Sequence, residues 1–286
     1  MSNNSQMHPS LCAKGLLKTV RSSFSQVKDS RKRPEISLTD HLMSGLAVFG
    51  LKYPSLLDFD SDRADPVMAA NLRHLYGIQR VPCDTRLREC LDEVSPNDLR
   101  QAFKQVFAQL QRGKGLEGMS YLDGHYLLSV DGTGYFSSKT VHCPHCRERH
   151  HRNGEITYYH QLLGAVLVHP DQAEVFPLAP EAMIKQDGTS KNDCERNAAK
   201  RLLKHVRREH PHLKLVVVED ALASNGPHIK LLKRLNMSFI LGAKASDHGL
   251  LFDWVDHSKE TKTVEHTDNK GVHHRFRYLN GAPLND

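Results

Sequence analysis

Long hydrophobic runs are missing from this sequence. In its 286 residues there is no stretch of about 18 or more apolar residues, the length that a membrane-spanning helix needs. Residues 1–14 are polar and lack the apolar centre of a secretion signal. Cysteine is scarce: of six residues, only Cys143 and Cys146 lie close together in the chain. This usage is typical of a reducing compartment and argues against a disulfide framework.

The balance of charge is mildly basic. Lys and Arg number 39 against 33 Asp and Glu, which gives a formal net charge of +6, and 19 histidines add positive charge when they are protonated. We therefore expect attraction to a polyanion to strengthen below about pH 6.5. The hydrophobic share of 39 % and the charged share of 25 % are ordinary for a globular protein of one or two domains.

Three regions are expected along the chain. Residues 1–34 are polar and end in the basic run Arg31–Pro34, which predicts a flexible basic leader, either a solvated tail or an arm that grips phosphate. Residues 35–117 are predicted to form a helical domain with a candidate DNA-binding role. Residues 118–286 have the alternating strand and helix signals of a sheet domain.

Two short helices in the second region resemble a helix-turn-helix. The apolar spacing predicts helices over 67–76 and 85–94, joined through a segment that contains Gly77. Arg86 and Arg88 fall near the start of the second helix, where a recognition helix contacts DNA. Plain packing of two helices explains the same pattern without DNA.

The third region has a specific order of elements. Three strands come first, and then a helix and a strand occur twice in alternation. A hairpin meander followed by α/β crossovers predicts an RNase H-like fold, a mixed α/β sheet flanked by helices. The predicted strands are 126–130, 158–168, 173–178, 213–218 and 237–241, and the helices between them are 193–209 and 227–235.

Two carboxylates fall at matching places in this order. Asp131 follows the first predicted strand and Asp220 follows the fourth, and these strands are neighbours in an RNase H-like sheet. Two close carboxylates repel each other unless a cation lies between them, and Mg²⁺ is a hard cation that prefers such oxygen ligands. A turn at each strand end also explains Asp at these positions without any metal.

Two segments around these acids resemble the first and second acidic motifs of insertion-sequence transposases of the DDE type. They are Val130–Gly134 and Val217–Pro227, and the segments Thr157–Gln161 and Lys191–Ala198 are similar to the same group. The resemblance covers residues 37–286. It implies Asp131 and Asp220 as catalytic metal ligands, Mg²⁺ or Mn²⁺ as cofactor, and cleavage and joining of transposon DNA. It further implies DNA as partner, a homo-oligomer on DNA, and a bacterial, cytoplasmic, nucleoid-associated protein.

Two departures from that family pattern are present. Ala221 stands where Gly commonly follows the second acid, and the family's third acid, a Glu on a downstream helix, has no counterpart before Asp286. Four acids downstream of Asp220 could replace this third acid, but none lies in a recognisable counterpart of the family's helix. We expect a truncated chain that is catalytically weak alone, and the alternative is an inactive remnant that only binds DNA. The substitutes considered are Asp247, Asp253, Glu260 and Glu265.

Further candidate DNA contacts lie on the predicted helix over 193–209, whose polar face is strongly basic. This face either contacts phosphates or is simply solvated. Two polar residues of the second acidic motif are also candidate contacts. The candidates are Lys200, Arg201, Lys204, Arg207, Arg208, Ser224 and Asn225.

A Cys–His cluster separates the first two predicted strands of the sheet. The pair Cys143 and Cys146, with His150 and His151 a short loop away, has the chemistry of a Zn²⁺ site. His142, His145 and His160 are further candidate ligands. A basic loop tip with no metal is the alternative explanation. A redox pair is less favoured because it should begin a helix after a strand.

Overall fold

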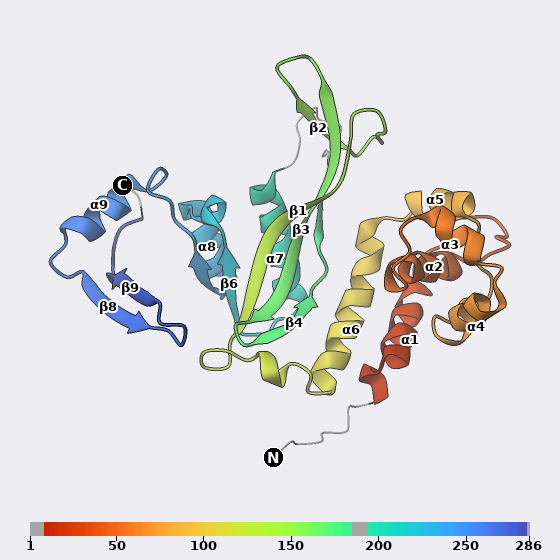
Figure 1. Ribbon diagram of the computed structural model, residues 1–286, viewed down its shortest axis with the longest axis horizontal. Helices are drawn as coiled ribbons and strands as arrows, with labels where there is room; N and C mark the ends of the chain where they lie inside the picture. The colour runs from red at the N-terminus through yellow and green to blue at the C-terminus, as the bar shows by residue number, and fades with distance from the viewer. Residues whose placement is uncertain (1–8, 185–193, 285–286) are drawn as a thin grey trace.

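A central mixed sheet organises the fold (Figure 1). The structure is a computed structural model and describes residues 9–184 and 194–284. The strands run in the order β2-β3-β1-β6-β7, and β4 and β5 also pair with β3. The strands are β1 (Tyr126–Ser138), β2 (Arg147–His150), β3 (Ile156–His169), β4 (Gln172–Pro177), β5 (Glu181–Met183), β6 (Leu215–Glu219) and β7 (Ser238–Leu241).

The directions of the strands identify the topology. β1 pairs antiparallel with β3, whereas β6 pairs parallel with β1 and β7 pairs parallel with β6. The crossovers to β6 and β7 contain the helices α7 (Glu195–Glu209) and α8 (Gly226–Arg234). The predicted mixed α/β class is therefore confirmed, and the strand order is the one expected for an RNase H-like sheet.

The sequence explains why β6 lies inside the sheet. Leu215, Val216 and Val217 are all buried, as expected for a parallel strand that is covered on both faces. α7 covers the sheet with an apolar stripe in which Leu202 and Leu203 are fully buried. Leu202 and Leu203 belong to one hydrophobic cluster with Leu215 and Val217 of β6 and Leu128 of β1.

From residue 9 onward, six α-helices precede the sheet and lie to one side of it (Figure 1). Side chains cap several of them, as at α2, where Ser37 accepts a hydrogen bond from the amide of Asp40. The helices are α1 (Ala13–Phe24), α2 (Leu38–Gly50), α3 (Leu56–Asp62), α4 (Pro66–His74), α5 (Asp84–Asp92) and α6 (Arg100–Arg112), with short 3-10 turns η1 (Pro9–Leu11), η2 (Pro96–Leu99) and η3 (Glu117–Met119).

The helical region has a hydrophobic cluster of its own, which includes Met43 and Leu72. The α6 helix joins this cluster to the sheet, because Ala102 is buried among the helices and Phe107 is buried against the sheet. Two separate clusters are compatible with the predicted boundary at residue 117, which stays a prediction.

The predicted flexible leader is wrong where the structure describes it. Ala13–Phe24 form α1, and Phe24 is buried in the helical cluster. Leu17 and Val20 pack against the same cluster. The spacing of Leu17, Val20 and Phe24 is helical and could have predicted this helix. The many polar residues between them favoured the interpretation as a flexible segment.

A small unit follows β7 on the opposite side of the sheet from the helical region (Figure 1). It consists of α9 (Gly249–His257) and the antiparallel pair β8 (Lys262–Thr267) and β9 (His273–Tyr278). Within the described ranges, no helix is both long enough and apolar enough to cross a bilayer.

Candidate functional site

Asp131 and Asp220 lie at one edge of the paired strands β1 and β6. The parallel pairing ends at Ser129 and Val218, and each aspartate comes two residues later on its own chain segment. Both line one small cavity of about 30 Å³. The cavity has room for water molecules or a small ion.

Each aspartate is held by a local hydrogen bond. The amide of Gly132 donates to Asp131 Oδ1 at 2.8 Å, and the amide of Leu222 donates to Asp220 Oδ1 at 2.9 Å. Asp220 thereby caps the 3-10 turn η4 (Ala221–Ala223). Both residues are exposed, and within the described ranges no basic side chain forms an ion pair with either carboxylate. One oxygen of each carboxylate thus stays open to a cation.

A third carboxylate that the sequence analysis did not assign lines the same cavity. Glu195 begins α7, and its carboxylate lies against the backbone of Gly132: a Cβ added to Gly132 would lie 2.5 Å from Glu195 Oε1. Glu195 belongs to the segment Lys191–Ala198 that resembles the transposase group. Its place in that segment was a signal, but its position beside Asp131 depends on how α7 packs on the sheet.

A buried contact between a histidine and a carboxylate supports the loop that carries Asp220. His228 Nε2 lies 2.5 Å from Glu219 Oε2, and each side chain is 6 % exposed. Glu219 is the residue before Asp220, and His228 lies in the first turn of α8. The pair therefore fastens the end of β6 to the start of α8 and fixes the backbone from which Asp220 projects.

Two predicted DNA contacts have structural roles in that loop. Ser224 is buried, and Asn225 caps α8 by accepting a hydrogen bond from the amide of His228. Neither side chain is thus presented as a free contact. Ala221 has no positive φ, so its methyl group is accommodated there without backbone strain.

The four substitute acids considered downstream lie apart from this cavity. All are exposed, and none is among the residues that line it. They are Asp247, before α9, Asp253 within α9, Glu260 after α9 and Glu265 in β8.

The basic helix α7 uses two of its five predicted contacts within the protein. Arg201 Nε donates to Glu181 Oε1 at 2.5 Å. Arg207 donates to the main-chain carbonyls of five residues, at distances from 2.8 to 3.3 Å. These guanidinium groups hold α7 to its neighbours. Lys200, Lys204 and Arg208 are exposed and stay available for a ligand.

The predicted helix-turn-helix differs from the observed geometry. The helices α4 and α5 exist, but residues 75–83 between them form a nine-residue connection, whereas the motif joins its helices with three or four residues. Arg86 and Arg88 of α5 are exposed, and each forms an ion pair within the helix, with Glu89 and Asp84 respectively. Their predicted contact with DNA stays a prediction.

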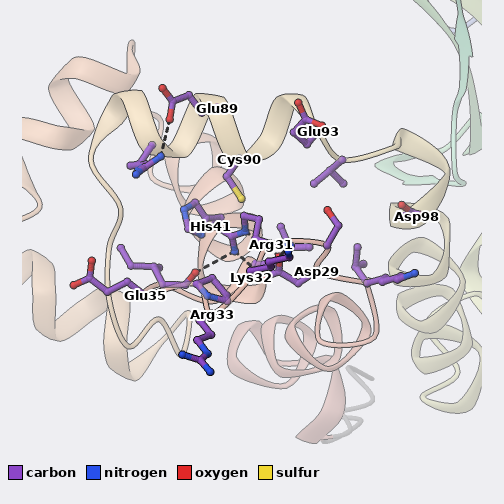
Figure 2. Close-up of a pocket in the computed structure, with 18 residues that line it drawn as sticks. Asp29, Arg31, Lys32, Arg33, Glu35, His41, Glu89, Cys90, Glu93 and Asp98 are labelled. Atoms are coloured by element: carbon purple, nitrogen blue, oxygen red, sulfur yellow. Dashed lines mark hydrogen bonds and ion pairs between the residues drawn. The ribbon is translucent and has the colours of Figure 1, made fainter.

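A larger cavity of about 490 Å³ lies beside α5 in the helical region (Figure 2). The basic run lines it, but Arg31 lies 2.7 Å from Asp29. The hydrogen bonds that Arg31 donates to Asp29 lower the pKa of the Asp29 carboxyl to about 2. Glu89 and Glu93 face the same space. The mixed charge of this wall does not favour phosphate over other ligands.

The Cys–His cluster is completed by a histidine that the sequence left as one of several alternatives. Cys143, Cys146 and His160 bring their ligand atoms within 4.8 Å of one another. The two preferred histidines lie elsewhere: His150 contacts Glu148, and His151 contacts Thr157. The register of the hairpin explains this difference, because β2 pairs Arg147 with Tyr159 and so places the preceding Cys146 beside His160.

A transposase–DNA complex is among the solved structures that this chain is similar to. No protein-family model and no curated protein matches the chain. Among solved structures, the chain is similar to a chain of a piggyBac transposase synaptic complex with hairpin DNA, solved by cryo-EM, at a TM-score of 0.36 and 12 % identity. The match covers 91 % of this chain and 56 % of that one. The present chain therefore spans little more than half of that transposase chain, and a similarity of this size leaves function to be argued from the residues above.

Proposed function

We propose that this chain is a DNA transposase, or part of one, that cuts and joins DNA by metal-dependent phosphoryl transfer. The observation that carries the proposal is that Asp131 and Asp220 line one cavity, each two residues beyond the point where the parallel pairing of β1 and β6 ends. Neither carboxylate is neutralised by a cation within the described part of the chain. The resemblance of both acidic segments to DDE transposases supports the same activity.

Carboxylate oxygens are the ligands that a hard divalent cation prefers. In the described part of the chain, Asp131, Asp220 and Glu195 line the same cavity but are not gathered within 4.8 Å of one another as the Cys143, Cys146 and His160 ligand atoms are. Asp131 and Asp220 would hold Mg²⁺ or Mn²⁺ through their open oxygens, and Glu195 would add a third carboxylate. Such an ion, when bound, stabilises the attacking and leaving oxygens of a phosphodiester displacement. The buried pair of Glu219 and His228 keeps the Asp220 backbone in place.

A basic groove between α7 and α8 supports DNA as the partner. Lys200, Lys204 and Arg234 line it together with apolar side chains, and its volume is about 480 Å³. In the described part of the chain none of these three cations forms an ion pair with an acid. Phosphate contacts of this kind add affinity without sequence selectivity, and they weaken as salt rises.

The experiment compares Mn²⁺ binding of the Asp131→Asn and Asp220→Asn variants with that of Asp253→Asn. Asp253 is an exposed acid in α9, away from the cavity. Calorimetric titration should show at least a 10-fold loss of affinity for each cavity variant, on the order of the effects known for residues around metal sites, and no change for the control. Unchanged Mn²⁺ affinity in Asp131→Asn would overturn the proposal.

A second candidate function is DNA binding without cleavage. The observation in its favour is that the exposed cations of α7 need no metal to contact phosphate. Binding to DNA ends that falls steeply with salt, with no nicking in Mg²⁺ or Mn²⁺, would select this function. Nicking that is lost in Asp131→Asn would select the transposase.

A further inference from the structure

The hairpin that β1, β2 and β3 form beyond the sheet has almost no core. This segment, residues 135–160, is called the arm below, and it projects past the rest of the sheet (Figure 1). Within it Cys146 alone is fully buried, and all other residues are partly or fully exposed. A segment of this size without a hydrophobic core usually needs a cross-link or a metal to hold one shape.

Two elements bring potential metal ligands together at the base of the arm. A turn closed by a hydrogen bond from the Cys146 amide to the Cys143 carbonyl, at 3.1 Å, directs both thiols to the same side. His160 comes from β3, opposite the residue that precedes β2. The ligands thus tie the loop before β2 to a strand of the central sheet.

The separations of the ligand atoms fit a tetrahedral ion. The two sulfurs are 3.8 Å apart, and His160 Nε2 lies 3.4 Å from Cys143 Sγ and 3.3 Å from Cys146 Sγ. A Zn²⁺ with bonds of about 2.3 Å to sulfur and about 2.0 Å to nitrogen predicts tetrahedral edges of about 3.8 Å and about 3.5 Å. A disulfide would bring the sulfurs to about 2.05 Å, and neither cysteine is part of a disulfide.

Neighbouring groups hold the ligand side chains in place. The amide of Cys143 donates toward Cys146 Sγ at 3.3 Å. The ring of Tyr135 stacks on His160 with an interplanar angle of 13° and fixes its orientation.

We propose that Cys143, Cys146 and His160 bind one structural Zn²⁺ that locks the arm onto β3. This site is separate from the carboxylate cavity, and it does not depend on the proposed transposase activity. Its consequence is positional: with the metal bound, the ring of Tyr159, on which the guanidinium groups of Arg147 and Arg149 stack, keeps a fixed place on the arm.

The test measures zinc in the full chain purified and reconstituted under reducing conditions. We expect one Zn²⁺ per chain by elemental analysis, and sulfur-to-metal charge-transfer absorption when Co²⁺ replaces it. His160→Ala and Cys143→Ser should lower the affinity by more than about 100-fold, whereas His150→Ala and His151→Ala should keep it. Both controls lie on the same arm outside the cluster.

A second measurement guards against variants that fail to fold. Arg149 and Arg152 are exposed. In the unaltered chain, a chelator should loosen the backbone around them and so allow rapid cleavage by trypsin, and added Zn²⁺ should restore protection. Failure of the reconstituted chain to bind zinc, equal affinity in His160→Ala, or loss of zinc in His150→Ala would each overturn the proposal. Asp131→Asn should keep its zinc, which separates this test from that of the carboxylate cavity.

Discussion

Replacing Gly132 with alanine tests whether the third carboxylate belongs to the metal site. The new Cβ would lie 2.5 Å from Glu195 Oε1 and 2.9 Å from its Cδ. Ordinary contact begins at 3.4 Å, so the carboxylate must retreat by about 0.9 Å. The atom in the way is the end of a flexible side chain, and it moves more easily than a backbone would. Gly132 has no positive φ, so alanine fits its backbone.

The expected effects on stability and on metal binding therefore differ. The free energy of unfolding should change by less than about 1 kcal/mol, because alanine is favoured over glycine in a strand by a similar amount. Metal affinity should fall by about 10- to 100-fold, because Mg²⁺ and Mn²⁺ need ligands close to ideal octahedral positions. A 100-fold loss corresponds to about 2.7 kcal/mol.

The assay is a calorimetric Mn²⁺ titration together with thermal unfolding of each variant. Gly134→Ala is the matched control, because it lies on the same strand and its new Cβ would be 3.8 Å from its nearest neighbours. If Gly132→Ala and Gly134→Ala bind Mn²⁺ equally well, the position of Glu195 has no part in metal binding and the reasoning is refuted.

Two further predictions concern stability. Arg100→Ala should lower the free energy of unfolding by about 3–5 kcal/mol in a denaturant titration. The reason is that the Arg100 side chain is only 11 % exposed, and its loss leaves Glu181 and Glu209 with fewer cationic partners. A decrease of less than about 1 kcal/mol would contradict this prediction. Burial lowers the pKa of His41 and His210 below the usual 6.5, so the unfolded chain takes up protons that the folded chain does not. The melting temperature should therefore fall as the pH drops below about 6.5, and a melting temperature that rises over that range would show the opposite linkage.

Much of the sheet could be predicted because the apolar pattern of a strand reflects whether one or both of its faces are buried. The apolar run over 213–218 predicts a strand covered on both faces, and the structure has Leu215–Glu219 there. The first strand was expected to end near Asp131, but β1 continues to Ser138, because Gly132 and Gly134 pair in the ladder with β3 rather than forming a turn. Glycine is compatible with both turns and extended strands, so the residues 132–134 alone could not show where β1 ends.

The candidate sites were only partly predictable, for a related reason. Asp220 follows β6 and Asp131 lies within β1, and the sequence pattern identifies both strands, so their shared cavity could be expected from the topology. Glu195 and His160 reach their sites through the packing of α7 and the register of β2 on β3. Recognising a turn at Asn153 and Gly154 would have identified that hairpin, and with it the proximity of Cys146 to His160.

The irregularity in the pairing of β1 with β3 determines which face of the arm points in the same direction as the carboxylate cavity. Gly134 pairs with Gln161 and Phe136 with His160, so Tyr135 is an extra residue on β1. Side chains of a strand alternate between its faces, and one extra residue inverts that alternation. The extra residue Tyr135 therefore reverses which face of β1 the side chains of the arm occupy, compared with the side chains beside the carboxylate cavity. A homologue that lacks this residue would present the arm's opposite surface to whatever the cavity holds.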